Sequence, residues 1–267
     1  MKNQQQRILE NNRRVLQRMQ SENDTLMVVE QDKTWFPPHP MKEKFDLTRP
    51  IVDVIIPSKT CGKTLPMIIN CIRSLRDSED KIQFNVVIVE SGEQVIDMGQ
   101  NITIQYPKHR FCYNHALNMG ISKTTNNWVV LANNDLIFKP GWMHEIIIAR
   151  NLRKDIESFS PWNDMWDWHS RYYGNMYPAI IEGYRIGVEL AGWCIVARRR
   201  IFEKVKLSER VNFWYSDNVY ADDLMRHGIK HALVTGSKVD HIVSQTHIVS
   251  AEESYASKEE YLNNTET

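Results

Sequence analysis

The stretch WVVLANNDLIFKPGW, residues 128–142, decides how the rest of this sequence is interpreted. Its uninterrupted apolar start is typical of a strand that is buried on both faces of a parallel sheet. Asn133, Asn134 and Asp135 follow directly at the end of this predicted strand. Ligands of α/β sheets bind beyond the carboxyl ends of the strands, so oxygen-bearing side chains here suit a hard cation such as Mg²⁺. An Asx turn is the alternative explanation of the same three residues.

Predicted strands and helices alternate around this stretch. Three further strands are indicated by apolar, β-branched segments: IVDVII (51–56), FNVVIVE (84–90) and NITIQY (101–106). One helix is predicted to begin near Pro66 and another to cover NHALNMGISK (114–123). Strands that alternate with helices predict an α/β fold, here a layered, Rossmann-like domain with a mostly parallel central sheet.

Composition limits the classes of protein to which the chain can belong. Its 267 residues, 42% hydrophobic and 25% charged, are enough to bury the core of one large domain. The formal net charge of zero gives no global attraction to nucleic acid or to an acidic membrane surface. The four cysteines form no CxxC pair, which argues against a zinc knuckle or a disulfide framework and favours a reducing cytoplasm. No apolar run approaches the roughly 20 residues that a membrane span requires.

Changes in composition divide the sequence into three predicted regions. Residues 1–50 are expected to form an amphipathic N-terminal helix followed by a proline-rich connector. Residues 51–250 are expected to form the folded domain, with two halves that meet after residue 142. Residues 251–267 are expected to form a polar C-terminal tail. The sequence does not predict an oligomeric state.

The segment PSKTCGKT, residues 57–64, ends like a phosphate-binding P-loop. A P-loop begins with glycine, whereas this segment begins with Pro57. Proline supplies neither the backbone N–H group nor the permissive dihedral angles that a phosphate cradle needs. We therefore interpret the segment as the end of a strand, with Thr64 capping the following helix.

Four motifs in the first half resemble those of the family 2 glycosyltransferases, which have the GT-A fold. They are VDVIIPSKT, VVIVESGE, FCYNHALNMG and NNDLIFKPGW, in the family's order. The resemblance implies that residues 51–142 bind a nucleotide-sugar donor. The donor-binding residues it implies are Pro57, Ser58, Glu90, His115, Asn118, Asn133 and Asn134. Glu90 and His115 depart from the family's usual Asp and Arg or Lys, which leaves the identity of the donor open.

Three motifs in residues 143–250 continue the resemblance and imply an acceptor half. LAGWCIVARRRIFEKV is similar to the family's acceptor-side strand and places Gly192 and Trp193 at the acceptor edge. SERVNFWYSDNVYADDLMRHG aligns Asp217 with the catalytic aspartate. ALVTGSKVDH is similar to the closing strand, whose final histidine can join the metal shell, and this implicates His241.

Two assignments in this half have alternatives. Asp222 and Asp223 are rivals of Asp217, and a helix would turn them to different faces. The segment SPWNDMWDWHSRYYGNMY, residues 160–177, mixes aromatic with polar residues. Its Trp166 and Trp168 are assigned to an acceptor loop, where rings stack on a sugar or an extruded base, with core packing as the alternative.

The resemblance implies an inverting, metal-dependent enzyme that moves a sugar from a nucleotide-diphosphate sugar to an acceptor hydroxyl. Asp135 and His241 would hold Mn²⁺ or Mg²⁺ on the diphosphate, and Asp217 would act as general base. Two acceptors are considered: a saccharide, or a hydroxymethylated DNA base with phosphate contacts from the N-terminal arm and Arg198–Arg200. The alternative function is a non-catalytic module that binds nucleotide-sugar or glycan.

Overall fold

The computed structural model describes residues 50–61, 64–92, 101–108, 110–164, 169, 173, 178–242, 258 and 260–262. All of them belong to one compact unit of the chain. The N-terminal arm and connector predicted for residues 1–50, apart from Pro50, lie outside the described residues, as does most of the predicted polar tail. These two predictions therefore stay predictions.

Strands and helices alternate along the described chain. The strands are β1 (Ile51–Ser58), β2 (Gln83–Glu90), β3 (Asn101–Gln105), β4 (Trp128–Ala132), β5 (Leu136–Phe138), β6 (Ile156–Trp162), β7 (Ile180–Glu182), β8 (Cys194–Arg198) and β9 (Lys230–His241). The helices are α2 (Leu65–Asp77), α3 (Tyr113–Ile121), α4 (Trp142–Leu152), α6 (Arg200–Lys204) and α7 (Ser216–Arg226). The strands and helices predicted for the first half are confirmed, with small differences at their ends.

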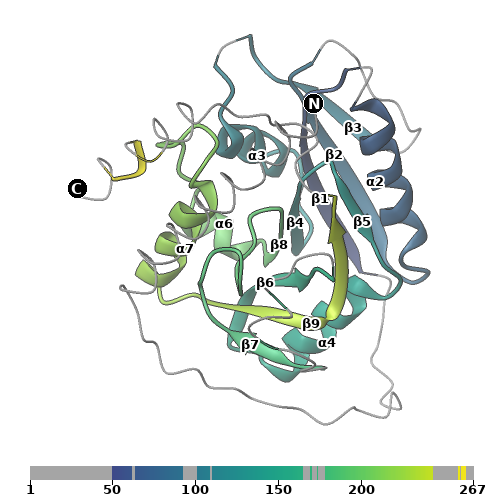
Figure 1. Ribbon diagram of the computed structural model, residues 1–267, viewed down its shortest axis with the longest axis vertical. Helices are drawn as coiled ribbons and strands as arrows, with labels where there is room; N and C mark the ends of the chain where they lie inside the picture. Colours follow the sequence, from purple (N-terminus) through teal and green to yellow (C-terminus); the bar gives the residue numbers. More distant parts are fainter. Residues whose placement is uncertain are drawn as a thin grey trace, which may run out of the picture. The chain divides into compact units, whose positions relative to one another are not determined.

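The strands form one mixed sheet in the order β3-β2-β1-β4-β8-β6-β9-β5, and β7 pairs with β9 (Figure 1). The first four strands in this order are parallel, as is the β6–β9 pair. β8 is antiparallel to β4 and β6, and β9 is antiparallel to β5 and β7. The α/β class is confirmed, but parallel pairing prevails only in the first half of the domain. A short apolar strand such as β8 looks the same in either direction, so its sequence does not reveal this reversal.

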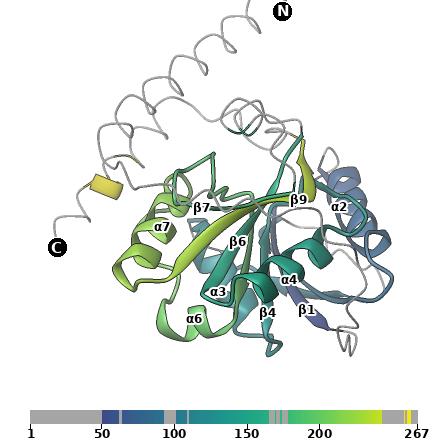
Figure 2. The same cartoon turned by 90° about the horizontal axis from the view of Figure 1, so that it is seen from below.

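Helices cover both faces of the sheet, which explains the continuous apolar runs of its central strands (Figures 1 and 2). Successive side chains of a strand point to opposite faces, so Val54 of β1 enters one core and Ile55 enters the other. α2 and α4 supply side chains to the first core, and α3, α6 and α7 supply the second. β4 is buried at every position between these two layers.

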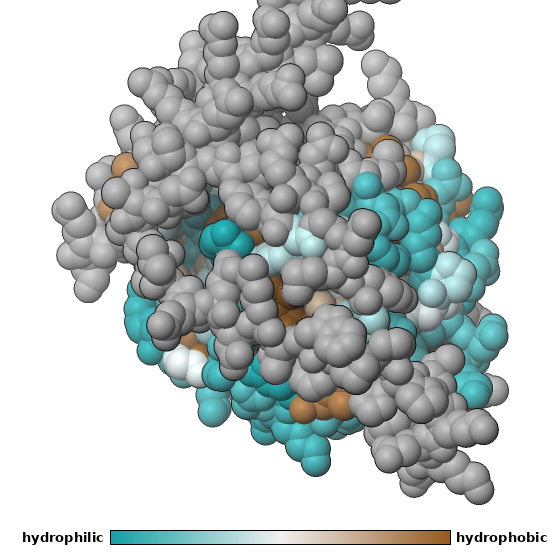
Figure 3. All heavy atoms as spheres, turned by 60° about the horizontal axis from the view of Figure 1, so that its bottom comes forward, coloured by the Kyte–Doolittle hydropathy of each residue, from teal (hydrophilic) through white to brown (hydrophobic). Residues whose placement is uncertain are grey.

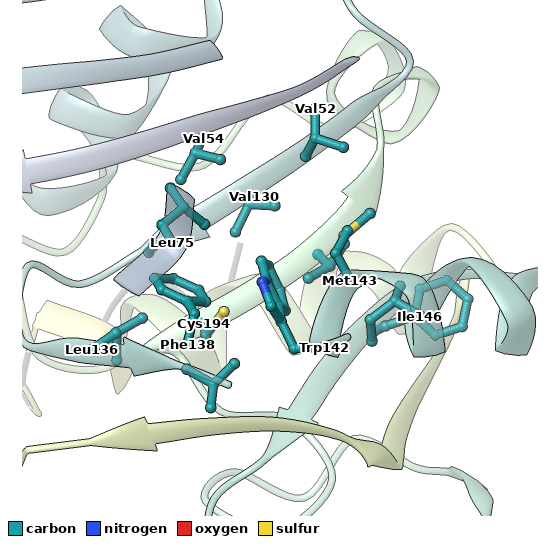
Figure 4. Close-up of a cluster of buried hydrophobic side chains, with 14 of the residues drawn as sticks. Val52, Val54, Leu75, Val130, Leu136, Phe138, Trp142, Met143, Ile146 and Cys194 are labelled. Carbon is teal, nitrogen blue, oxygen red and sulfur yellow. The ribbon is translucent and has the colours of Figure 1, made fainter. Parts of the chain in front are cut away.

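The first core is built around Trp142, the first residue of α4. The centroid of its ring lies 4.7 Å from that of Phe138 and 6.1 Å from that of Phe84. Its indole N–H donates to the Ser78 hydroxyl (3.0 Å), which satisfies the one polar group of a buried side chain. Met143 and other apolar side chains of this core surround the ring (Figure 4). Each large side chain buried in this way stabilises the fold by roughly 1.5–3 kcal/mol.

The first turn of α2 contains the predicted proline, but its N-cap differs from the prediction. Thr64 occupies the N-cap position without making the side-chain hydrogen bond of a cap. Its hydroxyl instead donates to the Lys59 carbonyl (3.0 Å) and accepts from the Cys61 N–H (2.8 Å). The Thr64 side chain therefore stabilises the turn that leaves β1 and not the helix. Gly62 and Lys63 lie outside the described residues.

On the face that Figure 3 shows, hydrophilic residues predominate among the described residues, and hydrophobic ones form small patches. The exposed large hydrophobic side chains come from different elements: Ile51, Ile102, Leu152, Trp214 and Leu262. Scattered exposed apolar residues of this kind are normal for a protein surface. None of the described helices is long and apolar enough to cross a membrane.

A buried ion pair joins β1 to the residue that follows β8. Asp53 is fully buried in β1, and its Oδ2 lies 2.9 Å from Nη2 of Arg199. Asp53 also accepts hydrogen bonds from the backbone and side chain of Asn126 and from the side chain of Asn85. Arg199 donates further to the Thr124 hydroxyl (2.6 Å). The network therefore fixes the start of β4 against β1 and β2.

Arg199→Met is expected to lower the free energy of unfolding by about 3–5 kcal/mol, because it leaves the carboxylate of Asp53 buried without its cation. Chemical denaturation measures this change. Lys206→Met is the matched control: it removes a side chain that is 76% exposed beside Glu209, and its expected effect is at most about 1 kcal/mol. Equal effects of the two substitutions would contradict a special role of the buried pair.

Candidate active site

Polar groups from three strand ends meet at the carboxyl edge of the parallel strands. Ser58 is the last residue of β1 and Glu90 is the last residue of β2, and the two are paired in register. Pro57 directly precedes Ser58 in β1. Asn134 lies in the turn that follows β4, and its Nδ2 is 3.4 Å from Oγ of Ser58. The structure thus brings together four of the residues predicted to bind the donor.

The carboxylate of Glu90 orders the turn that follows β1. Its Oε1 accepts hydrogen bonds from the N–H groups of Thr60 (2.7 Å) and Gly92 (2.6 Å), and its Oε2 accepts one from the Thr60 hydroxyl. A Cβ at residue 92 would lie 2.5 Å from the Thr60 carbonyl oxygen, so glycine is required at this close approach. Glu90 is fully buried and shapes the predicted donor pocket through this turn. Its direct contact with a donor stays a prediction.

Asp135 and His241 are brought together by the pairing of β5 with β9, whose register sets Leu136 opposite His241. Oδ1 of Asp135 lies 3.2 Å from Nε2 of His241. The imidazole ring stacks on Trp193, with 5.6 Å between centroids and 15° between planes. Two residues predicted as metal ligands, far apart in the sequence, therefore lie side by side.

This pair fits a divalent cation. Oδ1 of Asp135 and Nδ1 of His241 are buried and make no hydrogen bond within the described part of the chain. A buried carboxylate oxygen that accepts no hydrogen bond is costly, and a bound cation would compensate that cost. Carboxylate suits Mn²⁺ and Mg²⁺, and imidazole is a common ligand of transition metals. No third His, Cys, Asp or Glu among the described residues completes a cluster with them, so diphosphate and water would supply the remaining ligands.

Asp217 lies in the first turn of α7 against Gly192. Its Oδ1 accepts a hydrogen bond from the N–H of Asn218 (3.0 Å), and the backbone of Gly192 also hydrogen-bonds to it. A Cβ at residue 192 would lie 2.8 Å from Cβ of Asp217, so only glycine allows this approach. Burial raises the pKa of Asp217 above the ordinary value of 3.8, although the backbone hydrogen bonds oppose this shift. A carboxylate with a raised pKa is suited to accept a proton.

The rival carboxylates of α7 have other partners. Asp222 accepts a hydrogen bond from the Tyr261 hydroxyl (2.8 Å). Asp223 is buried, and its Oδ1 lies 2.7 Å from Nη1 of Arg226. These contacts favour Asp217 as the base, an assignment that stays a prediction.

Tyr113, which the sequence motifs did not identify, lies close to both Asp135 and Asp217. Its hydroxyl donates to Oδ1 of Asn133 (2.8 Å), whose N–H donates to the Trp193 carbonyl (2.9 Å). Burial raises the pKa of Tyr113, and the negative charges of Asp135 and Asp217 raise it further. The phenol therefore stays protonated and holds the side chain of Asn133 by its hydrogen bond. Its aromatic position within FCYNHALNMG is the sequence signal that identifies it in retrospect.

His115 and Asn118 of α3 contact the loop between α6 and α7. Nδ1 of His115 lies 3.0 Å from Oε2 of Glu209, and Nδ2 of Asn118 donates to Oε1 of Glu209 and to the Leu207 carbonyl (2.8 Å each). Both side chains therefore support the segment that leads to Asp217. Donor binding by them stays a prediction, and it would require an exchange of these partners.

The residues predicted for the acceptor side fall into two groups. Gly192 and Trp193 directly precede β8 and contact Asp217 and His241 respectively. Trp166 and Trp168 lie outside the described residues. Only Gly192 and Trp193 are therefore placed beside the predicted base and metal ligands, and their contact with an acceptor stays a prediction.

Arg198–Arg200, considered as contacts for DNA phosphates, lie at the opposite edge of the sheet from Asp135. Arg198 is paired in register with Trp128, the first residue of β4, whereas Asp135 follows the end of that strand. The guanidinium of Arg198 lies 4.8 Å from the centroid of the Trp128 ring, and Arg199 belongs to the buried ion pair. These arginines therefore have roles within the fold, away from the candidate site.

The model of the family described as glycosyl transferase family 2 matches residues 53–206, more than half of the chain. The chain belongs to glycosyl transferase family 2. The match includes the ends of β1, β2 and β4 and also Gly192 and Trp193. It ends before Asp217 and His241, whose roles therefore rest on the geometry. No curated protein matches the chain significantly.

Two solved structures of similar fold both contain Mn²⁺. One is the mannosyltransferase PcManGT from Pyrobaculum calidifontis in complex with GDP-Man and Mn²⁺, with a TM-score of 0.55 and 15% identity over 82% of this chain. The other is GalNAc-T7 with UDP, GalNAc and Mn²⁺, with a TM-score of 0.58 and 12% identity over 80% of this chain. This chain spans 62% and 48% of their respective lengths. At such low identity the likeness shows the fold alone, and the predicted GT-A fold is confirmed.

Gly192→Ala is expected to lower the free energy of unfolding by roughly 1–3 kcal/mol, because its methyl group would meet Cβ of Asp217 at 2.8 Å and Oδ2 at 2.9 Å. The control is the same substitution in an Asp217→Gly background, where both of these atoms are absent and the cost should shrink. Thermal unfolding of the four proteins gives the coupling between the two positions. Additive costs would contradict the close approach of α7 to residue 192.

Proposed function

We propose that this chain transfers a sugar from a nucleotide-diphosphate sugar to an acceptor hydroxyl, with inversion at the anomeric carbon. The observation that carries the proposal is that two neighbouring residues, Gly192 and Trp193, contact Asp217 and His241 respectively, while His241 lies 3.2 Å from Asp135. Oδ1 of Asp135 is buried beside His241 without a hydrogen bond in the described part of the chain, whereas Asp217 has a raised pKa. The presence of Mn²⁺ and of GDP-Man or UDP in the two solved transferases supports a metal-assisted donor site.

Asp135 and His241 are the residues that would hold Mn²⁺ or Mg²⁺. A divalent cation bound there would neutralise charge on the leaving diphosphate. Asn134 and the turn ordered by Glu90 lie next to Ser58 and would line the nucleotide end of the donor.

Asp217 would accept the proton of the acceptor hydroxyl. As the acceptor oxygen forms its bond to the anomeric carbon, the bond from that carbon to the diphosphate breaks on the opposite face. A single displacement of this kind inverts the configuration and needs no second carboxylate as nucleophile. A carboxylate with a raised pKa suits this role because it holds a proton more strongly than one with the ordinary pKa.

We favour a saccharide over DNA as the acceptor. The exposed ring of Trp214 lies two residues before the start of α7, close in sequence to Asp217, and an aromatic face of this kind can stack on a sugar ring. The arginines considered for DNA phosphates lie at the other edge of the sheet. A salt-sensitive shift of duplex DNA by the protein would reverse this preference.

A panel of UDP-, GDP-, CMP- and dTDP-sugars with Mn²⁺ should contain one donor that raises the melting temperature. A ligand at 100 times its Kd stabilises the folded state by about 2.7 kcal/mol. Asp135→Asn should weaken this stabilisation, because it removes a negative ligand of the cation. Asp155→Asn, at a carboxylate that is 47% exposed, is the matched control and should keep the response to donor and Mn²⁺. Donor binding that is independent of both Mn²⁺ and Asp135 would refute the metal assignment.

Asp217→Asn should retain donor-dependent stabilisation while transfer falls by about 10²–10⁴-fold, because the amide cannot accept the proton. Product formation with saccharide acceptors measures the change. Asp222→Asn and Asp223→Asn serve as controls and should stay active. Normal turnover of Asp217→Asn would remove the base assignment, and donor bound by the wild-type chain without any turnover would indicate the non-catalytic module.

The rate at saturating donor and Mn²⁺ should fall as the pH drops through the raised pKa of Asp217, because the protonated carboxyl is no longer a base. The acidic limb is therefore expected above the ordinary value of 3.8. The melting-temperature shift caused by donor and Mn²⁺, measured at each pH, distinguishes loss of the base from loss of donor or metal binding. A limb at or below 3.8 would show that Asp217 does not limit the reaction.

A further inference from the structure

A short segment near the end of the sequence, coloured yellow in Figure 1, has side chains that contact the region around the candidate base. Lys258 and Glu260–Leu262 of this segment are described and are helical. The side chains of Glu260 and Tyr261 reach the loop before α7 and α7 itself. None of the sequence motifs points to these residues, since they belong to the predicted polar tail.

Tyr261 bridges two positions that flank Asp217. Its ring stacks on Tyr215, with 5.3 Å between centroids and 13° between planes. Its hydroxyl donates to Oδ2 of Asp222 (2.8 Å). Tyr215 precedes the first residue of α7 and Asp222 lies in its second turn, so Tyr261 spans the helical turn that carries Asp217.

Tyr215 needs such support because its backbone is strained. Its φ of 66° makes it the one non-glycine residue with positive φ in the described part of the chain. A left-handed conformation costs a residue with a side chain on the order of 1–3 kcal/mol and persists only where the surroundings impose it. Its carbonyl accepts the N–H of Val219 (3.0 Å), which starts α7. The conformation of Tyr215 therefore sets the direction in which α7, and with it Asp217, leaves the loop.

Glu260 holds the other end of the same loop. Its Oε1 accepts a hydrogen bond from Nδ2 of Asn212 (2.7 Å) and lies 3.4 Å from Nη2 of Arg110. The carbonyl of Asn212 accepts the N–H of Tyr113 (2.6 Å), the residue whose hydroxyl reaches Asn133. Glu260 and Tyr261 thus hydrogen-bond to the two ends of residues 212–222, at Asn212 and Asp222 respectively.

We propose that Tyr261 and Glu260 are positioning residues that set the orientation of Asp217 through Tyr215, Asp222 and Asn212. They touch neither donor nor acceptor in this role. The effect on transfer rests on the proposed function, whereas the effect on the loop does not.

The test compares Tyr261→Ala, Tyr261→Phe and Glu260→Ala in the full chain. Hydrogen exchange of the peptide covering residues 211–220 should become faster in Tyr261→Ala and Glu260→Ala, because the loop loses one of its supports. Tyr261→Phe keeps the stacked ring and should stay closer to the wild-type rate. Tyr184→Phe is the matched control, since it removes a tyrosine hydroxyl that donates to the Ile229 carbonyl (3.0 Å), and it should leave this peptide unchanged.

Turnover provides the second measurement. Tyr261→Ala should lower kcat for transfer by about tenfold while the melting-temperature shift caused by donor and Mn²⁺ is kept, with Tyr261→Phe recovering most of the rate. Wild-type exchange of residues 211–220 in both Tyr261→Ala and Glu260→Ala would overturn the inference. If the wild-type chain transfers no sugar, the proposed function fails, and the exchange measurement still decides whether these residues position the loop.

Discussion

The burial of β1 and β4 on both faces is the constraint on which the rest of this structure depends. Each strand sends alternate side chains into two separate cores, so neither strand can carry a functional group along its length without burying it among apolar residues. Asp53 is the exception in β1, and it is neutralised by Arg199. Polar groups with a chemical role are therefore confined to the strand ends, where Ser58 and the turn after Ala132 leave the sheet.

The second half of the domain adds the remaining residues of the candidate site to those at the strand ends. β9 returns to pair with β5 and delivers His241 to Asp135, and α7 approaches the residue before Trp193 closely enough to exclude any side chain there. The two carboxylates then have different surroundings. Oδ1 of Asp135 is buried beside an imidazole without a hydrogen bond in the described part of the chain, whereas Asp217 accepts hydrogen bonds from backbone N–H groups. Environments that differ in this way suit a metal ligand and a proton acceptor respectively.

Much of this arrangement was predictable, and the exceptions share a cause. The strands, the helices and the turn at Asp135 follow from apolar periodicity and from motif order. The role of Tyr261 was not predictable, because a tyrosine in a polar tail carries no signal for the residues it will contact. The partners of Glu90 were equally hidden, since a carboxylate looks the same in sequence whether it faces a ligand or the N–H groups of its own turn. The position of Arg198–Arg200 in the fold was hidden as well, because the direction of β8 is not encoded in its apolar residues.

The sequence by itself determined the family, the α/β class and the position of the polar turn after the central strand, because these depend on local periodicity and on motifs that neighbouring residues carry together. Only the tertiary structure decided which distant residues meet. The register of β5 with β9 set the distance between Asp135 and His241. The absence of a Cβ at Gly192 allowed α7 to approach closely, and the ring of Tyr261 stacked on that of Tyr215. Contacts of this kind depend on how whole elements pack, and packing is a property of pairs of surfaces that no single stretch of sequence contains.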